Sequence, residues 1–189
     1  QLSGQGEDAL AVLQQAQTAD PEISALAKLQ LGSLFMQREE YGKALPLLTE
    51  AKAVLSEDAR CLFLHAVCLQ QNKLYDEALA SLEKLASGSG EFSGLAALQM
   101  AVIHLDNARY DQAASFARRA GEAGITSARQ STILGRVYAM QGEVNLAEEA
   151  YRRALSITGD YPAAHLELGL LLINRGAIDE GIRELEQYM

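Results

Sequence analysis

Three side chains that could bind a soft metal ion lie close together in the sequence: Cys61, His65 and Cys68. They occupy positions i, i+4 and i+7, so one face of a helix presents all three. A structural zinc site takes four ligands, and no fourth Cys or His lies in register nearby. The two cysteines are about 10 Å apart along such a helix, too far for a disulfide. We therefore expect core packing, with no metal or other cofactor bound.

Motifs for catalysis are absent from the sequence. It holds no G-x-S-x-G, no H-E-x-x-H and no dinucleotide fingerprint in a strand context. The Gly/Ser-rich segment 87–94 imitates a phosphate loop in spacing, but no strand precedes it and no Lys-Ser/Thr pair follows it. Paired carboxylates such as Glu148 and Glu149 are expected on turns or outward helix faces. The sequence therefore predicts that the chain is not an enzyme.

Composition and charge narrow the class of partner. Apolar residues make up 49% of the chain, yet only 6% are aromatic and none is Trp, so Ala and Leu must fill the interior. A net charge of −9 disfavours nucleic acids and anionic membrane surfaces, since both are bound through clustered Lys and Arg. No apolar run reaches the 18 residues of a membrane-spanning helix, so no direct membrane insertion is expected. These properties argue against nucleic acids and membranes as partners.

A pattern of small residues repeats along the chain. Gly32, Ala66, Ala101, Gly135 and Gly169 stand 34, 35, 34 and 34 positions apart. A second small residue follows each of them by twelve positions: Ala44, Ala78, Ala113, Ala147 and Gly181. This period predicts a helical solenoid, in which each unit buries its apolar face by stacking on its neighbours. Small residues at both positions allow the two helices of a unit to approach closely.

Turn and capping residues divide each unit into two helices. Gly142 and Gly176 stand where the chain must reverse direction, a place that suits a positive φ. Pro21 and Pro162 are expected to begin first helices, with Asp20 and Asp160 as capping candidates.

On these residues the chain resembles the tetratricopeptide-repeat (TPR) proteins. The resemblance implies an all-α, right-handed α-solenoid of antiparallel helix pairs. The chain departs from the family pattern in two ways. The aromatic residue that is frequent early in the first helix is missing, and so is the closing proline after most units. We expect one continuous solenoid with these boundaries: the second helix of a truncated leading repeat and a link at 1–24, then repeats at 25–58, 59–93, 94–127, 128–161 and 162–189. Neither end carries an obvious cap, which suggests a fragment or an array that stacks on something else.

One extra residue interrupts the period within 87–94. Because this segment is the richest in Gly and Ser, we expect a flexible connection there and a possible hinge between the second and third repeats.

The resemblance also implies which residues face a partner, because the first helices of similar proteins line the inner face. The inward positions taken as partner-binding are Leu29, Gln30, Ser33, Met36, Gln37, Arg60, Phe63, Leu64, Val67, Gln70, Gln71, Leu98, Gln99, Val102, Arg129, Ile133, Arg136 and Met140. Asp106, Glu167 and Leu170 fall on inward positions too. Apolar and amide side chains together suit an extended peptide or an amphipathic helix.

Two functions follow. The first is a scaffold that binds a protein segment during assembly of a larger complex, with a bacterial secretion or envelope system suggested by the Ala/Leu/Gln-rich composition. The Lys/Asn clamp of the family members that hold chaperone tails is absent, since Leu29, Ser33 and Leu64 stand at its positions. The second is an architectural module that associates with itself through its ends. A cytoplasmic or a periplasmic location fits either function.

Overall fold

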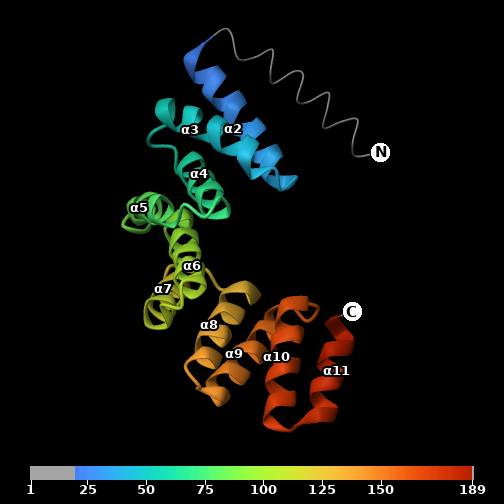
Figure 1. The fold of residues 1–189 in the computed structure, drawn as a ribbon. Coiled ribbons are helices and arrows are strands. Elements are labelled where there is room, and N and C mark those ends of the chain that lie inside the picture. Colours follow the sequence, from blue (N-terminus) through green and yellow to red (C-terminus); the bar gives the residue numbers. More distant parts are fainter. Residues whose placement is uncertain (1–19, 189) are drawn as a thin grey trace. The chain divides into compact units, whose positions relative to one another are not determined.

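The computed structural model describes residues 20–188, and in this range the chain forms ten helices in five antiparallel pairs (Figure 1). The pairs are α2 (Pro21–Gln37) with α3 (Tyr41–Val54), α4 (Ala59–Gln71) with α5 (Tyr75–Ala86), α6 (Glu91–Asp106) with α7 (Tyr110–Glu122), α8 (Ala128–Met140) with α9 (Val144–Ile157), and α10 (Pro162–Arg175) with α11 (Ile178–Tyr188). The all-α prediction is therefore confirmed. The leading half repeat predicted within 1–24 lies almost wholly outside the described residues.

The chain divides into two compact units between Gly88 and Ser89. Unit 1 contains α2 to α5, and unit 2 contains α6 to α11. The division falls inside the predicted Gly/Ser link, but the link is shorter than expected. Residues 91–94 already belong to α6, and Gly94 is buried, with no room for a Cβ beside the Ile125 side chain.

A side-chain capping hydrogen bond is present at the start of α2 and absent at the start of α10. Asp20 caps α2 by accepting from the backbone N–H of Glu22 at 2.7 Å, and the proline at Pro162 begins α10 as predicted. The expectation for Asp160 is wrong, because Tyr161 occupies the N-cap position of α10 and makes no side-chain capping bond. The rigid φ of Pro162 substitutes for a side-chain cap at that helix start.

The turn inside each repeat uses the same backbone conformation five times. Gly142 and Gly176 have φ of 80° and 92°, as their positions predicted. The equivalent residues of the other repeats, Glu39, Lys73 and Ala108, have φ of 60°, 63° and 55° although each carries a side chain. The repeat geometry therefore imposes the left-handed conformation whether or not the residue is glycine.

The small residues of the period allow the two helices of each pair to touch. A Cβ on Gly32 would lie 2.7 Å from Cγ of Leu48, and a Cβ on Gly135 would overlap the ring of Tyr151. Ala66 and Ala101, at the same position in other repeats, are fully buried. At Gly32 and Gly135 the facing side chain of the second helix therefore leaves no room for a Cβ.

Within the described range, no helix is both long enough and apolar enough to cross a membrane.

Candidate protein-binding surface

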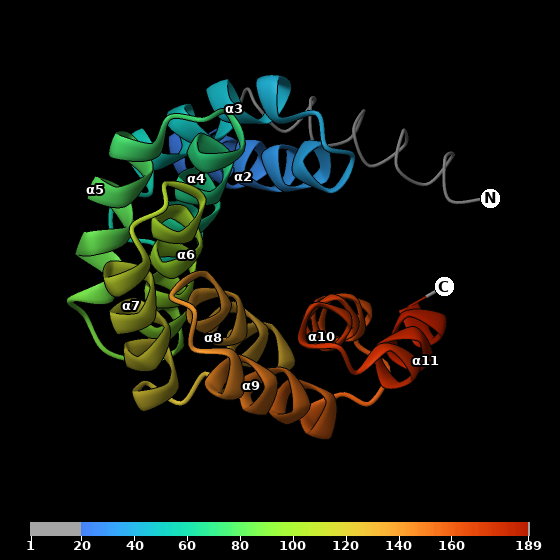
Figure 2. The same ribbon diagram turned by 60° about the horizontal axis from the view of Figure 1, so that its bottom comes forward.

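The first helices form the inner row of each unit. In unit 2 the backbones of α6, α8 and α10 approach one another in sequence, whereas no such approach joins α7, α9 and α11 in the described part of the chain (Figure 2). In unit 1, α2 likewise approaches α4. The row that packs more closely must be the concave side of a stack of helix pairs. The structure thus places the first helices where the resemblance implied.

The eighteen predicted partner-binding residues are divided between core and surface. Five of them are buried: Leu29, Gln70, Leu98, Gln99 and Ile133. Six are half-buried: Ser33, Met36, Phe63, Leu64, Val67 and Val102. Seven are exposed: Gln30, Gln37, Arg60, Gln71, Arg129, Arg136 and Met140. A first helix packs against the second helix of its own repeat and against the adjacent first helix of its unit, so the stripe that a partner can reach is narrower than the inward half of the helix. The five buried residues are therefore corrected to packing residues.

Two arginines on α8 join the inner row of unit 2 together. Arg129 donates to Oε1 of Gln99 on α6 at 3.3 Å, and Nε of Arg136 lies 3.3 Å from Oε1 of Glu167 on α10. The side chains of Arg136 and Glu167 are 46% and 32% exposed, so water screens this pair and its net stabilisation is a few tenths of a kcal/mol. These contacts orient charges on the inner face more than they stabilise the fold.

A cavity of about 410 Å³ opens on this face where α6 and α8 end. Asp106, Tyr110, Arg136, Met140 and Glu167 line it, together with Leu105, Ala139 and Tyr151. Met140 is 58% exposed, and Leu170 on α10 is 47% exposed. Met140 belongs to the cavity lining, and Leu170 follows Glu167 of the lining by three residues on α10.

Tyr151 is the buried residue in the wall of this cavity. Its side chain comes from α9 and is 1% exposed. Burial raises the pKa of the phenol, the nearby charge of Glu167 raises it further, and Arg136 opposes the shift. The phenol therefore stays neutral. Tyr151 and Tyr110 come from second helices, which is why a search restricted to first helices missed them, although both recur in the packing pattern.

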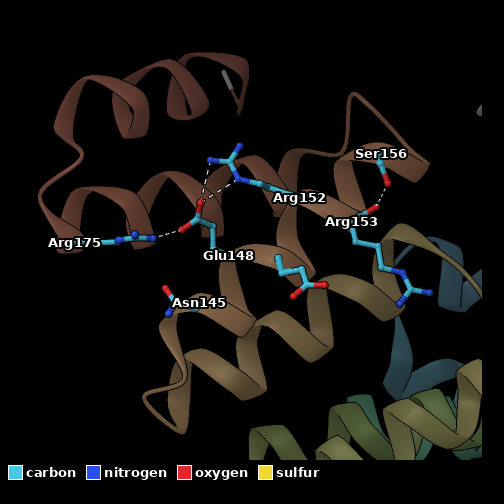
Figure 3. A pocket seen from close by; sticks show the side chains of 7 residues that line it. Asn145, Glu148, Arg152, Arg153, Ser156 and Arg175 are labelled. Carbon is cyan, nitrogen blue, oxygen red and sulfur yellow. Dashed lines mark hydrogen bonds and ion pairs between the residues drawn. The ribbon is translucent and has the colours of Figure 1, made fainter.

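A larger open hollow, of about 670 Å³, lies on α9 and the end of α10. There Glu148 pairs with Arg152 and Arg175 (Figure 3). Arg152 also pairs with Glu180 on α11. Arg153 points away from this cluster (Figure 3). Glu148 is 19% exposed, whereas its partners Arg152 and Arg175 are 47% and 51% exposed. These ion pairs join consecutive repeats, and the lining of the hollow contains no large apolar side chain.

The cysteine and histidine cluster is a core feature, as expected. Cys61 and Cys68 are both fully buried free thiols in the core of unit 1. Burial raises the pKa of both, that of Cys68 to about 11, so the thiols remain protonated. In residues 20–188 no group of three His, Cys, Asp or Glu side chains is arranged to hold a metal ion.

Sequence profiles identify the repeat in both units. A tetratricopeptide-repeat profile matches residues 29–96, and a TPR-repeat profile matches residues 135–176. With five helix pairs in the described range, the chain belongs to the TPR proteins. No curated protein matches it by sequence.

Solved structures share the fold at low sequence identity. MamA from Desulfovibrio magneticus, from residue 41 to its end, superposes with a TM-score of 0.69 at 17% identity, over 90% of this chain and 94% of that chain. A thermophilic TPR protein of Thermus thermophilus gives a TM-score of 0.73 at 22% identity, over 87% and 89%. The Cut9–Hcn1 hetero-tetramer of the APC/C gives 0.84 at 15% identity, over 98% of this chain and 37% of that chain.

Proposed function

We propose that the chain is a non-catalytic scaffold whose inner face in unit 2 binds a short segment of a partner protein during assembly of a larger complex. The carrying observation is the exposure of Met140 in the lining of the charged cavity and of Leu170 three residues after Glu167, another residue of that lining. TPR proteins typically mediate protein–protein interactions, which supports this assignment. A bacterial secretion or envelope complex remains a prediction from composition.

The surface favours a segment in extended or amphipathic helical form. Met140 and Leu170 offer two apolar contacts. Arg129 and Arg136 offer hydrogen-bond donors that are seven residues apart, about 10 Å along the axis of α8. A folded partner surface could not enter a cavity of this size, whereas single side chains of a segment could.

The proposal is tested by adding charge to the apolar anchors. Met140→Glu and Leu170→Glu replace exposed side chains, so the fold should survive, and we expect co-purified partners to be lost from both variants in quantitative proteomics. The matched controls are Leu146→Glu and Ile157→Glu on α9, whose side chains are 43% and 40% exposed. Unchanged partners in the first two variants, or equal loss in the controls, would overturn the assignment of this face.

A second function, self-association, is favoured by the last helix. Ile178, Ile182 and Tyr188 of α11 are 55%, 45% and 46% exposed. Sedimentation velocity over a range of concentrations tests this function. If α11 mediates association, Ile182→Glu should abolish any larger species, and a monomer at every concentration would exclude it.

A further inference from the structure

We propose that the cavity of unit 2 receives a lysine or arginine side chain of the partner segment, while a neighbouring apolar side chain of the segment lies on Met140 and Leu170. This inference rests on the proposed binding function of the inner face and adds the chemistry of the occupant.

The charges of the cavity do not cancel. Its lining contains two carboxylates, Asp106 and Glu167, and one guanidinium, Arg136. Arg136 is already paired with Glu167 at 3.3 Å. The side chain of Asp106 is exposed and takes part in no ion pair or hydrogen bond with any residue of the described range. The cavity therefore presents one uncompensated negative charge to an incoming side chain.

Two helix ends add to this negative potential. Asp106 is the last residue of α6 and Met140 is the last residue of α8, and both line the cavity. In the turns that follow, Ala108 N–H donates to the carbonyl of Leu105 at 3.0 Å and Gly142 N–H to that of Ala139 at 3.1 Å. The carbonyls of Asp106 and Met140 come one residue later in the chain than these two acceptors and are the last of their helices. The carboxyl end of a helix carries partial negative charge, which favours a cation.

The other cations of this region lie outside the cavity lining. Arg129 stands at the opposite end of α8, where it donates to Gln99. Arg109 lines the adjoining hollow with Asp111 and Gln141, and Tyr110 belongs to the linings of both hollows. An anionic side chain in the cavity would meet Asp106 with no unpaired cation in the lining to hold it. Charge complementarity therefore favours a basic side chain over an acidic one.

The apolar part of the lining suits the stem of the same side chain. Lys and Arg bury their methylene stems against apolar surface while the charged group reaches a polar partner. The side chain of Met140 is exposed and unbranched, so it can adapt to the methylene stem. Tyr110 contributes an aromatic ring to the same lining. The net charge of −9 also raises the rate at which a basic segment encounters the chain.

Methionine-methyl NMR tests the inference directly, because the chain has four methionines and they differ in environment. Met140 is exposed at the cavity and Met100 is 2% exposed in the core. The probes are three pentapeptides, acetyl-Ala-Leu-Xaa-Leu-Ala-amide with Lys, Gln or Glu at Xaa, titrated to millimolar concentration. The Lys peptide should shift the Met140 signal in a saturable manner, with Met100 unmoved and the Glu peptide without effect. Met140→Leu assigns the signal.

Charge variants separate a specific contact from general attraction. Asp106→Asn should weaken binding of the Lys peptide about two- to fivefold, the range expected for an exposed ion pair, and should bring it level with the Gln peptide. Asp179→Asn removes the same charge from α11, outside the cavity lining, and should leave the affinity unchanged. Equal weakening by the two variants would overturn the assignment of Asp106.

The remaining outcomes distinguish this inference from the function on which it rests. No saturable Met140 shift with the Lys peptide, or a stronger response to the Glu peptide, overturns the basic occupant. If Met140→Glu still loses its co-purified partners in that case, the inner face remains the binding surface and only the chemistry of the occupant is wrong. If partners are retained as well, the proposed function fails too.

Discussion

The two units use the same repeat frame but fill their inner faces differently. In unit 1, α2 and α4 present half-buried Met36, Phe63, Leu64 and Val67, and no ion pair joins these two helices in the described range. In unit 2, the ion pair of Arg136 with Glu167 joins α8 to α10. The residues that pack one helix against the next are therefore similar in the two units, whereas the residues on the inner face differ in polarity and charge.

The histidines show the same contrast between the units. His65 of unit 1 is 6% exposed and lies near Lys52, and burial first and then that charge lower its pKa to about 4. His165 of unit 2 is 7% exposed, with Nδ1 2.7 Å from Oε2 of Glu184 and Nε2 2.9 Å from the carbonyl of Gly159. Both ring nitrogens of His165 face acceptors, an arrangement that favours the protonated ring and raises its pKa. The same residue type thus has a lowered pKa in one unit and a raised pKa in the other.

The largest expected effect concerns His65. Its folded pKa of about 4 lies below the unfolded value of ~6.5, so the unfolded chain binds the extra proton as the pH falls between them. This histidine should therefore remove stability on the order of 3 kcal/mol between pH ~6.5 and ~4. His65→Leu, which installs the residue that Leu134 and Leu168 provide at this position, should lessen the loss in urea titrations at several pH values. Equal pH dependence in both proteins would contradict it.

The next effect compares the helix contacts of the two units. Gly135→Ala places a Cβ into the rigid ring of Tyr151, which is 1% exposed, and should cost about 2–3 kcal/mol of unfolding free energy. Gly32→Ala meets Leu48, whose side chain can change rotamer where the Tyr151 ring is rigid, and should therefore cost about 1 kcal/mol less. Urea unfolding followed by circular dichroism measures both. A larger loss for Gly32→Ala would refute this ranking.

The contact of His165 with Glu184 should make the docking of α11 depend on pH in the opposite sense. Burial tends to lower the pKa of His165, but the hydrogen bonds to Glu184 and Gly159 and the charges of Glu184 and Asp160 raise it overall. Its stabilisation is therefore present below the unfolded pKa of ~6.5 and is lost as the pH rises through the folded value. Amide exchange in α11, corrected for the intrinsic pH dependence, should speed up over that rise.

Two variants on α11 check the origin of that pH dependence. Glu184→Gln removes the carboxylate that faces Nδ1 and should abolish the change. Glu186→Gln, exposed on the same helix, should preserve it. A pH dependence that persists in Glu184→Gln would assign it to another group.

The smallest effect concerns the left-handed turns. Ala108 has φ of 55° with a side chain present, so Ala108→Gly should raise stability by about 0.5–1 kcal/mol. Gly142→Ala at the same position of the next repeat should lower it by a similar amount. Differential scanning calorimetry of the two variants should give shifts of opposite sign. Shifts of the same sign would mean that the repeat frame relieves the strain at Ala108.

Much of the fold could be predicted from the sequence, and the candidate site could be predicted only in part. The period of small residues led to the helix pairs because close helix packing is a local requirement repeated in every unit. The turn residues were found only at Gly142 and Gly176, because Glu39, Lys73 and Ala108 carry no composition signal for a positive φ. Asp160 was chosen as a cap from its residue type alone, and the proline after Tyr161 made it unnecessary.

The sequence by itself determined the architecture and the small and large positions of each helix pair. Only the tertiary structure decided which inward residues remain accessible, since Leu98 and Ile133 are covered by neighbouring helices while Met140 is not. It also decided that Asp106, Arg136 and Glu167 share one cavity with Tyr110 of a second helix. The physical reason is that periodicity follows from contacts within a repeat, whereas accessibility and charge balance depend on side chains contributed by three consecutive repeats.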